Sequence, residues 1–168
     1  GMPYTPAADW VDLYYDGVYR GTYLVSETNA VGSTGVDITG METAYAAVNA
    51  DYGSDMTTAA AENRYGRTYR YTAGLTEPAD ITGGYLLARS DTAKAKQDAA
   101  NGFVTARGCA MNVQSPAWCG RDAMAYISEY YQAFEDAVYA QDAAGNYTGY
   151  NAETGKYYYE YCDLTSLV

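Results

Sequence analysis

Histidine is absent from the 168 residues, and lysine occurs at only three positions. Without histidine, the chain can form neither a histidine-based catalytic triad nor a histidine-ligated metal site. The cysteines Cys109, Cys119 and Cys162 include no CxxC pair, which argues against a zinc site. No apolar run approaches the roughly 20 residues that a membrane-spanning helix needs. We therefore expect no metal site and no membrane span within this chain.

Basic residues are scarce: 10 Lys and Arg stand against 21 Asp and Glu, for a formal net charge of −11. Nucleic acids and anionic membranes bind clustered Lys and Arg, so neither is an expected partner. Tyrosine, at 21 residues, and glycine, at 17, are abundant instead. Tyrosine-rich, lysine-poor acidic chains are common among bacterial surface proteins. The length suits a single domain spanning residues 1–168.

The most informative stretch runs from Asp9 to Glu27. Two runs rich in aromatic and β-branched residues flank Asp16-Gly17, a dipeptide that favours a type I′ turn. This pattern predicts a β-hairpin with strands at about 10–15 and 18–26. Both faces are largely apolar or aromatic, so we expect the hairpin to be covered on both sides and central in a sheet.

A two-residue loop fixes the expected pairing of this hairpin. On one face it pairs Tyr15 with Val18, Leu13 with Arg20 and Val11 with Thr22, and on the other Trp10 with Tyr23 and Tyr14 with Tyr19. Gly21, in mid-strand, marks a place where another group can approach the backbone.

Between the hairpin and residue 113 the signals are shorter. The spacing of apolar residues predicts a helix over Met41–Val48, capped by Asp37 or Thr39. Residues 49–67 are expected to form a surface excursion with a helical turn at 56–63, and residues 90–102 a loop or loose helix. The strands that we expect in this part of the chain lie at 68–71, 83–89, 103–105 and 109–113, the last two paired around Arg107-Gly108.

The clearest helix begins at Ser115-Pro116, because serine caps helices and proline suits the first helical position. We expect this helix to span Pro116–Ala143 and Gly120 to kink its first turn. One apolar stripe contains Met124, Ile127, Tyr131, Phe134 and Val138, whereas a solvated face explains Glu129, Glu135, Asp136 and Asp142. A turn-rich loop at 147–155, an extended run at 156–161 and a helix start capped by Asp163 follow. The fold class is α+β: a mainly antiparallel sheet with one long helix packed across it.

The cysteines leave two interpretations open. Cys109 and Cys119 flank a short connection, so they can form a disulfide in an oxidising compartment. The alternative is three buried free thiols, and we expect Cys162 to be one in either case.

Four sequence blocks resemble the CotH family, which is named for a spore-coat protein and comprises atypical secreted protein kinases. The first is the hairpin, with its pattern Tyr-x-Asp-Gly-x-Tyr-x-Gly-x-Tyr-Leu-x-x-Glu ending at Glu27. The other three are Gly35-Val-Asp-Ile-Thr-Gly-Met-Glu42, Thr82-Gly-Gly-Tyr-Leu-Leu87, and Val113-Gln-Ser-Pro116 with the helix that follows it. The blocks occur in the family's order and span about residues 9–168.

The resemblance implies part of an atypical kinase fold without its catalytic C-terminal lobe. In that family the phosphate-binding basic elements lie before the first block, and the catalytic and metal-binding aspartates lie after the last. The parent protein would then use ATP and Mg²⁺ to phosphorylate Ser or Thr of a protein substrate, and this chain alone would be inactive. Secretion would place the protein outside the cell or on its surface, with the signal outside this sequence.

The resemblance makes Glu27 and Arg20 the nucleotide-facing candidates. Glu27 either faces the nucleotide or pairs with a lysine outside this chain; alternatively, it caps a strand end or binds Arg20. One departure from the family is that Ala88 stands where a glutamate often follows Gly-Gly-Tyr-Leu-Leu. Gly83-Gly84 is not followed by Lys-Ser/Thr, so a P-loop is not indicated.

Two other classes remain as alternatives. A non-enzymatic binding or structural module on a bacterial surface fits the composition, because exposed Tyr and Trp stack on sugars or on partner side chains. A glycosidase needs two carboxylates about 5–10 Å apart across a cleft, and the sequence singles out no such pair. A deep cleft between the hairpin and another layer would favour the kinase, and a shallow aromatic platform the binding module.

Overall fold

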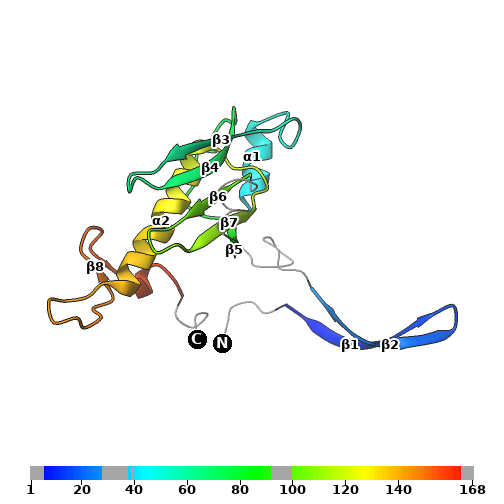
Figure 1. The fold of residues 1–168 in the computed structure, drawn as a ribbon. Helices are drawn as coiled ribbons and strands as arrows, with labels where there is room; N and C mark the ends of the chain where they lie inside the picture. The colour runs from blue at the N-terminus through cyan, green and yellow to red at the C-terminus, as the bar shows by residue number, and fades with distance from the viewer. Residues whose placement is uncertain (1–5, 28–37, 39, 92–99, 164–168) are drawn as a thin grey trace.

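The computed structural model describes residues 6–27, 38, 40–91 and 100–163. The fold of these residues is α+β with antiparallel strand pairing and one long helix (Figure 1). The helices are α1 (Met41–Val48), α2 (Arg121–Tyr139) and the 3₁₀ helix η2 (Tyr158–Glu160). The strands are β1 (Ala8–Tyr15), β2 (Val18–Ser26), β3 (Thr57–Glu62), β4 (Thr68–Ala73), β5 (Leu86–Arg89), β6 (Gly102–Val104), β7 (Ala110–Ser115), β8 (Tyr150–Asn151) and β9 (Lys156–Tyr157).

The body of the molecule is a five-stranded antiparallel sheet in the order β3-β4-β6-β7-β5. Helix α2 lies across one face of this sheet, and α1 lies near one end (Figure 1). The core forms where these elements meet, and it contains Met41, Tyr45, Tyr69, Phe103, Met111, Val113, Cys119, Ala123, Met124 and Ile127. The predicted fold class, α+β with a mainly antiparallel sheet and one long helix packed across it, is therefore confirmed.

Several predicted elements are confirmed. Helix α1 has the predicted bounds. The strands expected at 68–71, 103–105 and 109–113 appear as β4, β6 and β7, and β6 and β7 pair around Arg107-Gly108 as expected. The predicted caps Asp37 and Thr39, most of the loop at 90–102 and the helix after Asp163 lie outside the described residues.

The predicted start of the long helix is wrong. Residues 110–115 form strand β7, and the Ser115-Pro116 peptide bond is cis, so the helix does not begin there. Helix α2 begins at Arg121, with Gly120 as its N-cap residue rather than a kink in its first turn. The helix also ends earlier than predicted, at Tyr139.

The helical turn predicted at 56–63 is wrong as well. Residues 57–62 form β3, which pairs with β4 along its whole length. The amide oxygen of Asn63 accepts hydrogen bonds from the backbone N–H groups of Tyr65 and Arg67, both 3.0 Å long. The Asn63 side chain thus closes the turn between β3 and β4. Pairing with β4 overrides the helix propensity of the alanines in β3. The predicted strand at 83–89 is shorter than expected, and only Lys156–Tyr157 of the extended run at 156–161 is a strand.

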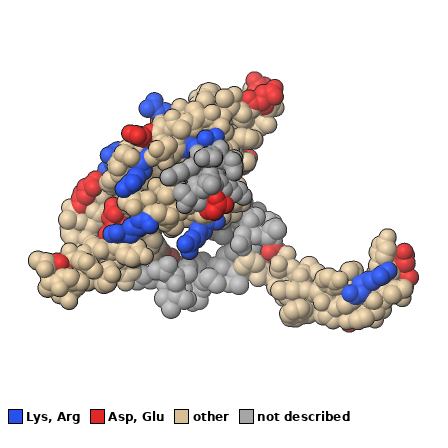
Figure 2. All heavy atoms as spheres, in the orientation of Figure 1, with Lys and Arg blue, Asp and Glu red and all other residues tan. Residues whose placement is uncertain are grey.

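The predicted hairpin exists, but it is neither central in a sheet nor covered. Strands β1 and β2 form a two-stranded sheet of their own, which extends away from the body (Figure 1). Every residue of the two strands is exposed except Gly21, which is half-buried. Most of its visible surface is uncharged (Figure 2). The apolar and aromatic side chains on both faces of the hairpin are therefore exposed, and no other described element packs against them.

The predicted register of the hairpin is right only near the turn. Tyr15 pairs with Val18 and Tyr14 with Tyr19, as expected, but Leu13 then pairs with Gly21 because of a β-bulge. Gly21 adopts φ 119°, a conformation that side chains rarely tolerate. The bulge shifts all later pairs by one residue, so Trp10 faces Leu24 rather than Tyr23.

The three cysteines are all described, and each is a free thiol. Cys119 immediately precedes α2, whereas Cys109 contacts Tyr131, ten residues inside that helix. The possible Cys109–Cys119 disulfide is therefore absent from this structure. Cys119 is fully buried, but Cys109 and Cys162 are only half-buried, so the expectation of a buried Cys162 is wrong.

Within the described residues, no helix combines the length and the apolar character needed to cross a bilayer.

Candidate functional site

The two nucleotide-facing candidates lie far apart on the hairpin. Arg20 is near the turn, where its guanidinium carbon lies 5.9 Å from the centre of the Tyr15 ring. Glu27 follows the end of β2, and its carboxylate accepts a 3.0 Å hydrogen bond from the backbone N–H of Ala7. Seven strand residues separate the two side chains by about 23 Å. The structure therefore does not bring Arg20 and Glu27 into one site, and Glu27 closes the base of the hairpin.

A shallow hollow beside Glu27 has a volume of about 350 Å³. Its lining residues are Ala7, Ala8, Asp9, Val11, Val25, Ser26 and Glu27. Two of these are carboxylates and none is basic, so a phosphate bound here would need a cation from elsewhere. The charge of this hollow does not favour a nucleotide on its own.

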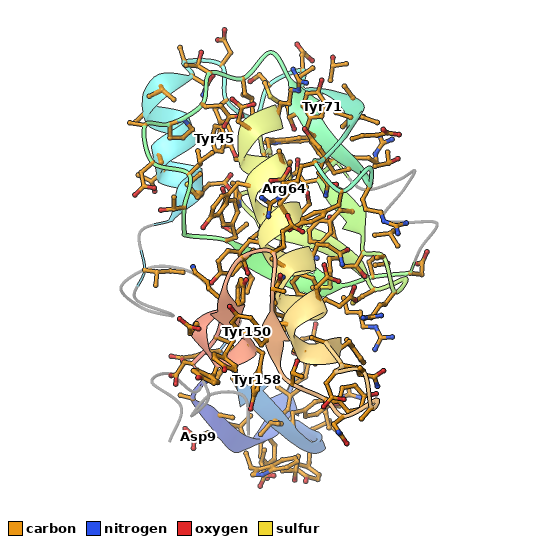
Figure 3. All side chains as sticks on the ribbon, turned by 90° about the vertical axis from the view of Figure 1, so that its left-hand side faces the viewer. Asp9, Tyr45, Arg64, Tyr71, Tyr150 and Tyr158 are labelled. Atoms are coloured by element: carbon orange, nitrogen blue, oxygen red, sulfur yellow. The ribbon has the colours of Figure 1, made fainter. Side chains whose placement is uncertain are left out.

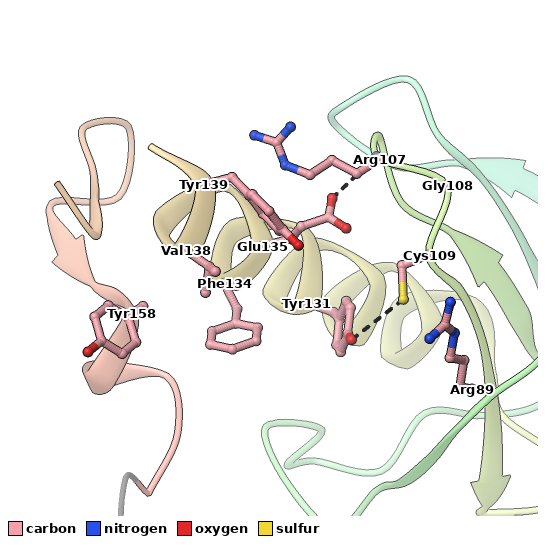
Figure 4. Close-up of a pocket in the computed structure, with 10 residues that line it drawn as sticks. All are labelled: Arg89, Arg107, Gly108, Cys109, Tyr131, Phe134, Glu135, Val138, Tyr139 and Tyr158. Atoms are coloured by element: carbon pink, nitrogen blue, oxygen red, sulfur yellow. Dashed lines mark hydrogen bonds between the residues drawn. The ribbon is translucent and has the colours of Figure 1, made fainter. Parts of the chain in front are cut away.

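A larger cavity of about 510 Å³ lies beside the C-terminal half of α2 (Figure 4). It is bounded by α2, the end of β5, the turn between β6 and β7, and η2. Its lining residues are Arg89, Arg107, Gly108, Cys109, Tyr131, Phe134, Glu135, Val138, Tyr139 and Tyr158. None of them belongs to the hairpin, and none was predicted from the sequence to bind a ligand; Cys109 was predicted only as one half of a possible disulfide.

The apolar wall of the cavity is the continuation of the predicted stripe on α2. Met124 and Ile127 are buried against the sheet, whereas Tyr131, Phe134 and Val138 are only half-buried. The rings of Tyr131 and Phe134 meet edge to face, with centroids 6.1 Å apart. The stripe therefore continues beyond the part that the sheet covers, and its last turns face the cavity.

Glu135 fixes the opposite wall, and its predicted place on a solvated face is wrong. It is buried, and its carboxylate accepts hydrogen bonds from the Thr105 hydroxyl at 2.7 Å and the Arg107 backbone N–H at 3.4 Å. The Gln132 side chain accepts a 2.7 Å bond from the Ala106 backbone N–H and donates to Glu135 at 3.3 Å. Together the two side chains hold the β6–β7 turn against α2.

The sequence did contain a signal for this role of Glu135. It follows Tyr131 by four residues and Met124 by eleven, and both spacings return to the same side of a helix. Glu135 therefore falls at the edge of the apolar stripe, where an acidic side chain must find hydrogen-bond donors. No sequence pattern identified those donors, because the turn at 105–109 reaches α2 only in the folded chain.

The charges around the cavity are mostly basic. No carboxylate of the described residues lies within 4.0 Å of the Arg89 or Arg107 guanidinium, since both ion pairs found there involve Arg64. Arg107 instead lies over the ring of Tyr139, 4.5 Å from its centre. Burial raises the pKa of Tyr131 to about 12, with a further contribution from its contact with Cys109, so its hydroxyl is neutral at physiological pH.

Sulfur and hydroxyl groups meet at the wall of this cavity. Cys109 Sγ lies 3.7 Å from the Tyr131 hydroxyl, and Arg89 and Arg107 line the same cavity. Within the described ranges, no three His, Cys, Asp or Glu side chains are grouped so that they could hold a metal ion.

Exposed tyrosines also gather at the other end of the chain. The rings of Tyr157 and Tyr159 stack with centroids 5.2 Å apart and an angle of 6° between their planes, and the Tyr150 ring centroid lies 4.9 Å from that of Tyr157. Figure 3 labels Tyr150 and Tyr158 of this group. Stacking covers the facing sides of the Tyr157 and Tyr159 rings, while 41% and 47% of these residues stay exposed.

Comparisons with family models, with curated proteins and with solved structures returned no match for this chain.

Proposed function

We propose that the chain is the framework part of a CotH-like secreted protein kinase and is inactive by itself. The intact parent would transfer phosphate from Mg-ATP to Ser or Thr of a protein substrate outside the cell or on its surface. This proposal rests on the four sequence blocks and on where two of them lie in the fold.

The observation that carries the proposal is the way these blocks join. The Thr82-Gly-Gly block leads into β5, and the Gln-Ser-Pro block ends β7. These strands are hydrogen-bonded neighbours, with Leu86 paired to Ser115, although 29 residues separate them in sequence. The helix that follows the last block is α2, which crosses the same sheet. These two blocks, which lie far apart in the sequence, thus belong to one sheet-and-helix unit, as parts of a shared fold would.

The resemblance implies that this chain is an inactive framework. Phosphoryl transfer depends on a cation at the phosphates, carboxylates that hold Mg²⁺ and an aspartate at the accepting hydroxyl. In the CotH family these groups lie before the first block and after the last. The net charge of −11 also repels a nucleotide. The residues that complete the site would come from the rest of the parent.

The experiment compares this chain with the full-length parent. Calorimetry with Mg-ATP should detect no binding to the 168-residue chain and clear binding to the parent. A radiolabelled phosphate assay should show transfer by the parent alone. Micromolar affinity or phosphate transfer by the chain, or an inactive parent, would contradict the proposal.

A second candidate is a non-enzymatic binding module, and the exposed hairpin favours it. Ten large hydrophobic side chains of β1 and β2 are exposed, from 39% for Val11 to 72% for Trp10. An isolated two-stranded hairpin is marginally stable in water, so these faces call for a cover. In the kinase the cover is the rest of the parent, whereas in a binding module it is a separate partner.

Hydrogen exchange of the hairpin amides distinguishes these two candidates. If the kinase proposal holds, amides 8–26 exchange at least about tenfold more slowly in the full-length parent than in this chain. Amides of β7 serve as the internal control, because that strand lies inside the five-stranded sheet, between β6 and β5. Equal, fast exchange of the hairpin in both would favour the binding module.

A further inference from the structure

We propose that the cavity beside α2 binds a small planar aromatic ligand that carries a carboxylate. This inference is independent of the kinase proposal, because the cavity contains neither the hairpin nor any residue expected to face a nucleotide.

The size and walls of the cavity suit a single aromatic group. Its volume of about 510 Å³ lies within the roughly 300–1,000 Å³ of small-molecule sites. Tyr131, Phe134 and Val138 line the cavity from α2, and Tyr158 faces them from η2 (Figure 4). An aromatic ring between these walls can pack edge to face or offset against them.

The polar groups point to an anion rather than a cation. The acceptor oxygens of Glu135 already receive hydrogen bonds from Thr105, Arg107 and Gln132, so its carboxylate is committed to holding the turn. Arg107 lies over the Tyr139 ring. Arg89 is exposed at the rim, with no carboxylate of the described residues within ion-pair distance. A ligand carboxylate at the rim can take two hydrogen bonds from this guanidinium.

Aromatic rings alone would also accept a cationic ligand. Two guanidinium-bearing residues border this cavity, however, and both would repel a cation. The combination of an apolar slot with an exposed guanidinium at its mouth, which has no ion-pair partner among the described residues, therefore selects an aromatic acid over a neutral or basic aromatic compound.

The test uses three probes with the same ring and different charges. Indole-3-acetate is the anion, indole-3-acetamide the neutral analogue and tryptamine the cation. In NMR titrations of the ¹⁵N-labelled chain, indole-3-acetate should shift the amides of Gly108, Cys109 and residues 131–139. Its affinity should exceed those of the other two probes by about threefold to tenfold, as one charge-assisted contact at a partly exposed site provides.

Arg89→Gln should remove that difference, so that indole-3-acetate and indole-3-acetamide bind equally. Arg67→Gln is the matched control, because Arg67 is also exposed and lies outside the lining of the cavity. It should leave the preference for the anion intact. The absence of shifts at millimolar probe, shifts mapping elsewhere, or an equal loss in the two variants would overturn the proposal.

Discussion

The side chain of Tyr45 is completely buried, and its hydroxyl group joins three segments of the chain. The hydroxyl donates a hydrogen bond to Glu77 and accepts one of 2.9 Å from the Gly120 backbone N–H. Its ring stacks on Tyr52, with centroids 5.8 Å apart. Tyr45 lies beside the N-terminal half of α2 (Figure 3). One residue of a short helix thus fixes both the loop at 74–78 and the start of the long helix.

Replacing this tyrosine, by Tyr45→Phe, should lower the free energy of unfolding by about 1–3 kcal/mol. The change leaves the buried Gly120 N–H without a hydrogen-bond acceptor. A buried donor without a partner costs its full desolvation free energy, which is about 1–3 kcal/mol. Chemical denaturation measures the effect. Tyr71→Phe is the control: Tyr71 is half-buried and meets Tyr69 through its ring, a contact that phenylalanine keeps. Equal losses in the two variants would show that the hydroxyl network of Tyr45 contributes nothing specific.

Helix α2 starts without a side chain of its own as a cap. Its N-cap residue is Gly120, and the carboxylate of Glu77 supplies the missing acceptor by binding the Asp122 backbone N–H at 2.8 Å. Gly120 has an ordinary φ of −73°, so its backbone does not require glycine. Glycine is required instead because there is no room for a side chain: an added Cβ would lie 2.8 Å from the Glu77 carboxyl carbon.

Gly120→Ala should therefore destabilise the protein by about 1–2 kcal/mol, the usual cost of losing a helix cap, because it displaces Glu77. In a Glu77→Ala background the same change should cost less than about 0.5 kcal/mol, since no carboxylate remains to be displaced. Urea denaturation of the four proteins in this cycle gives the coupling. If the two costs simply add, Gly120 does not act by making room for Glu77.

At the scale of elements, the sequence predicted most of what depends on local patterns. Helix α1 and the paired strands β6 and β7 follow from spacing and from the Arg107-Gly108 turn. The failures involve distant partners. The start of α2 depends on Glu77, and strand β3 depends on pairing with β4. The bulge at Gly21 depends on a backbone conformation that glycine permits, but a glycine in the sequence does not by itself predict a bulge.

The candidate site shows the same division. The residues of the apolar wall, Tyr131, Phe134 and Val138, all belong to the stripe predicted on α2. We expected the sheet to cover this C-terminal half of the stripe as well, but the sheet buries only its N-terminal half. Arg89 and Arg107 come from separate segments, the end of β5 and a turn, and only the fold brings them to the same cavity. A site assembled from such segments has no local sequence signature.

At the scale of the whole molecule, the ion pairs found between described residues contribute little to stability. The two ion pairs among the described residues join Arg64 to Glu129 at 3.5 Å and to Glu153 at 3.6 Å, and the Arg64 side chain is half exposed. Exposed pairs of this kind contribute at most about 1 kcal/mol each. Acidic and basic side chains lie scattered over the visible surface (Figure 2). Stability therefore depends on the core and on buried neutral groups such as Cys119 and Tyr45.

These buried groups make the protein sensitive to alkali. Burial raises the pKa of the Cys119 thiol to about 12, and it raises the pKa values of Tyr45 and Tyr85 far above the ordinary tyrosine range. In the unfolded chain the thiol ionises near pH 8.5 and the tyrosines near pH 10. Between these values the native state holds protons that the unfolded state has lost. The resulting stability is complete below about pH 8.5 and falls as the pH rises toward the native values.

We therefore expect the free energy of unfolding to decline in two stages as the pH is raised. From about pH 8.5 to 10 the decline should approach 1.4 kcal/mol per pH unit, because Cys119 alone accounts for one proton. Above pH 10 the decline should steepen as Tyr45 and Tyr85 begin to ionise in the unfolded chain. Urea denaturation at intervals of half a pH unit measures both stages. Cys119→Ala should flatten the first stage and leave the second, whereas Tyr45→Phe should make only the second shallower. A stability that stays constant from pH 8 to 11, or a first stage unchanged in Cys119→Ala, would show that proton uptake by these buried groups does not stabilise the fold.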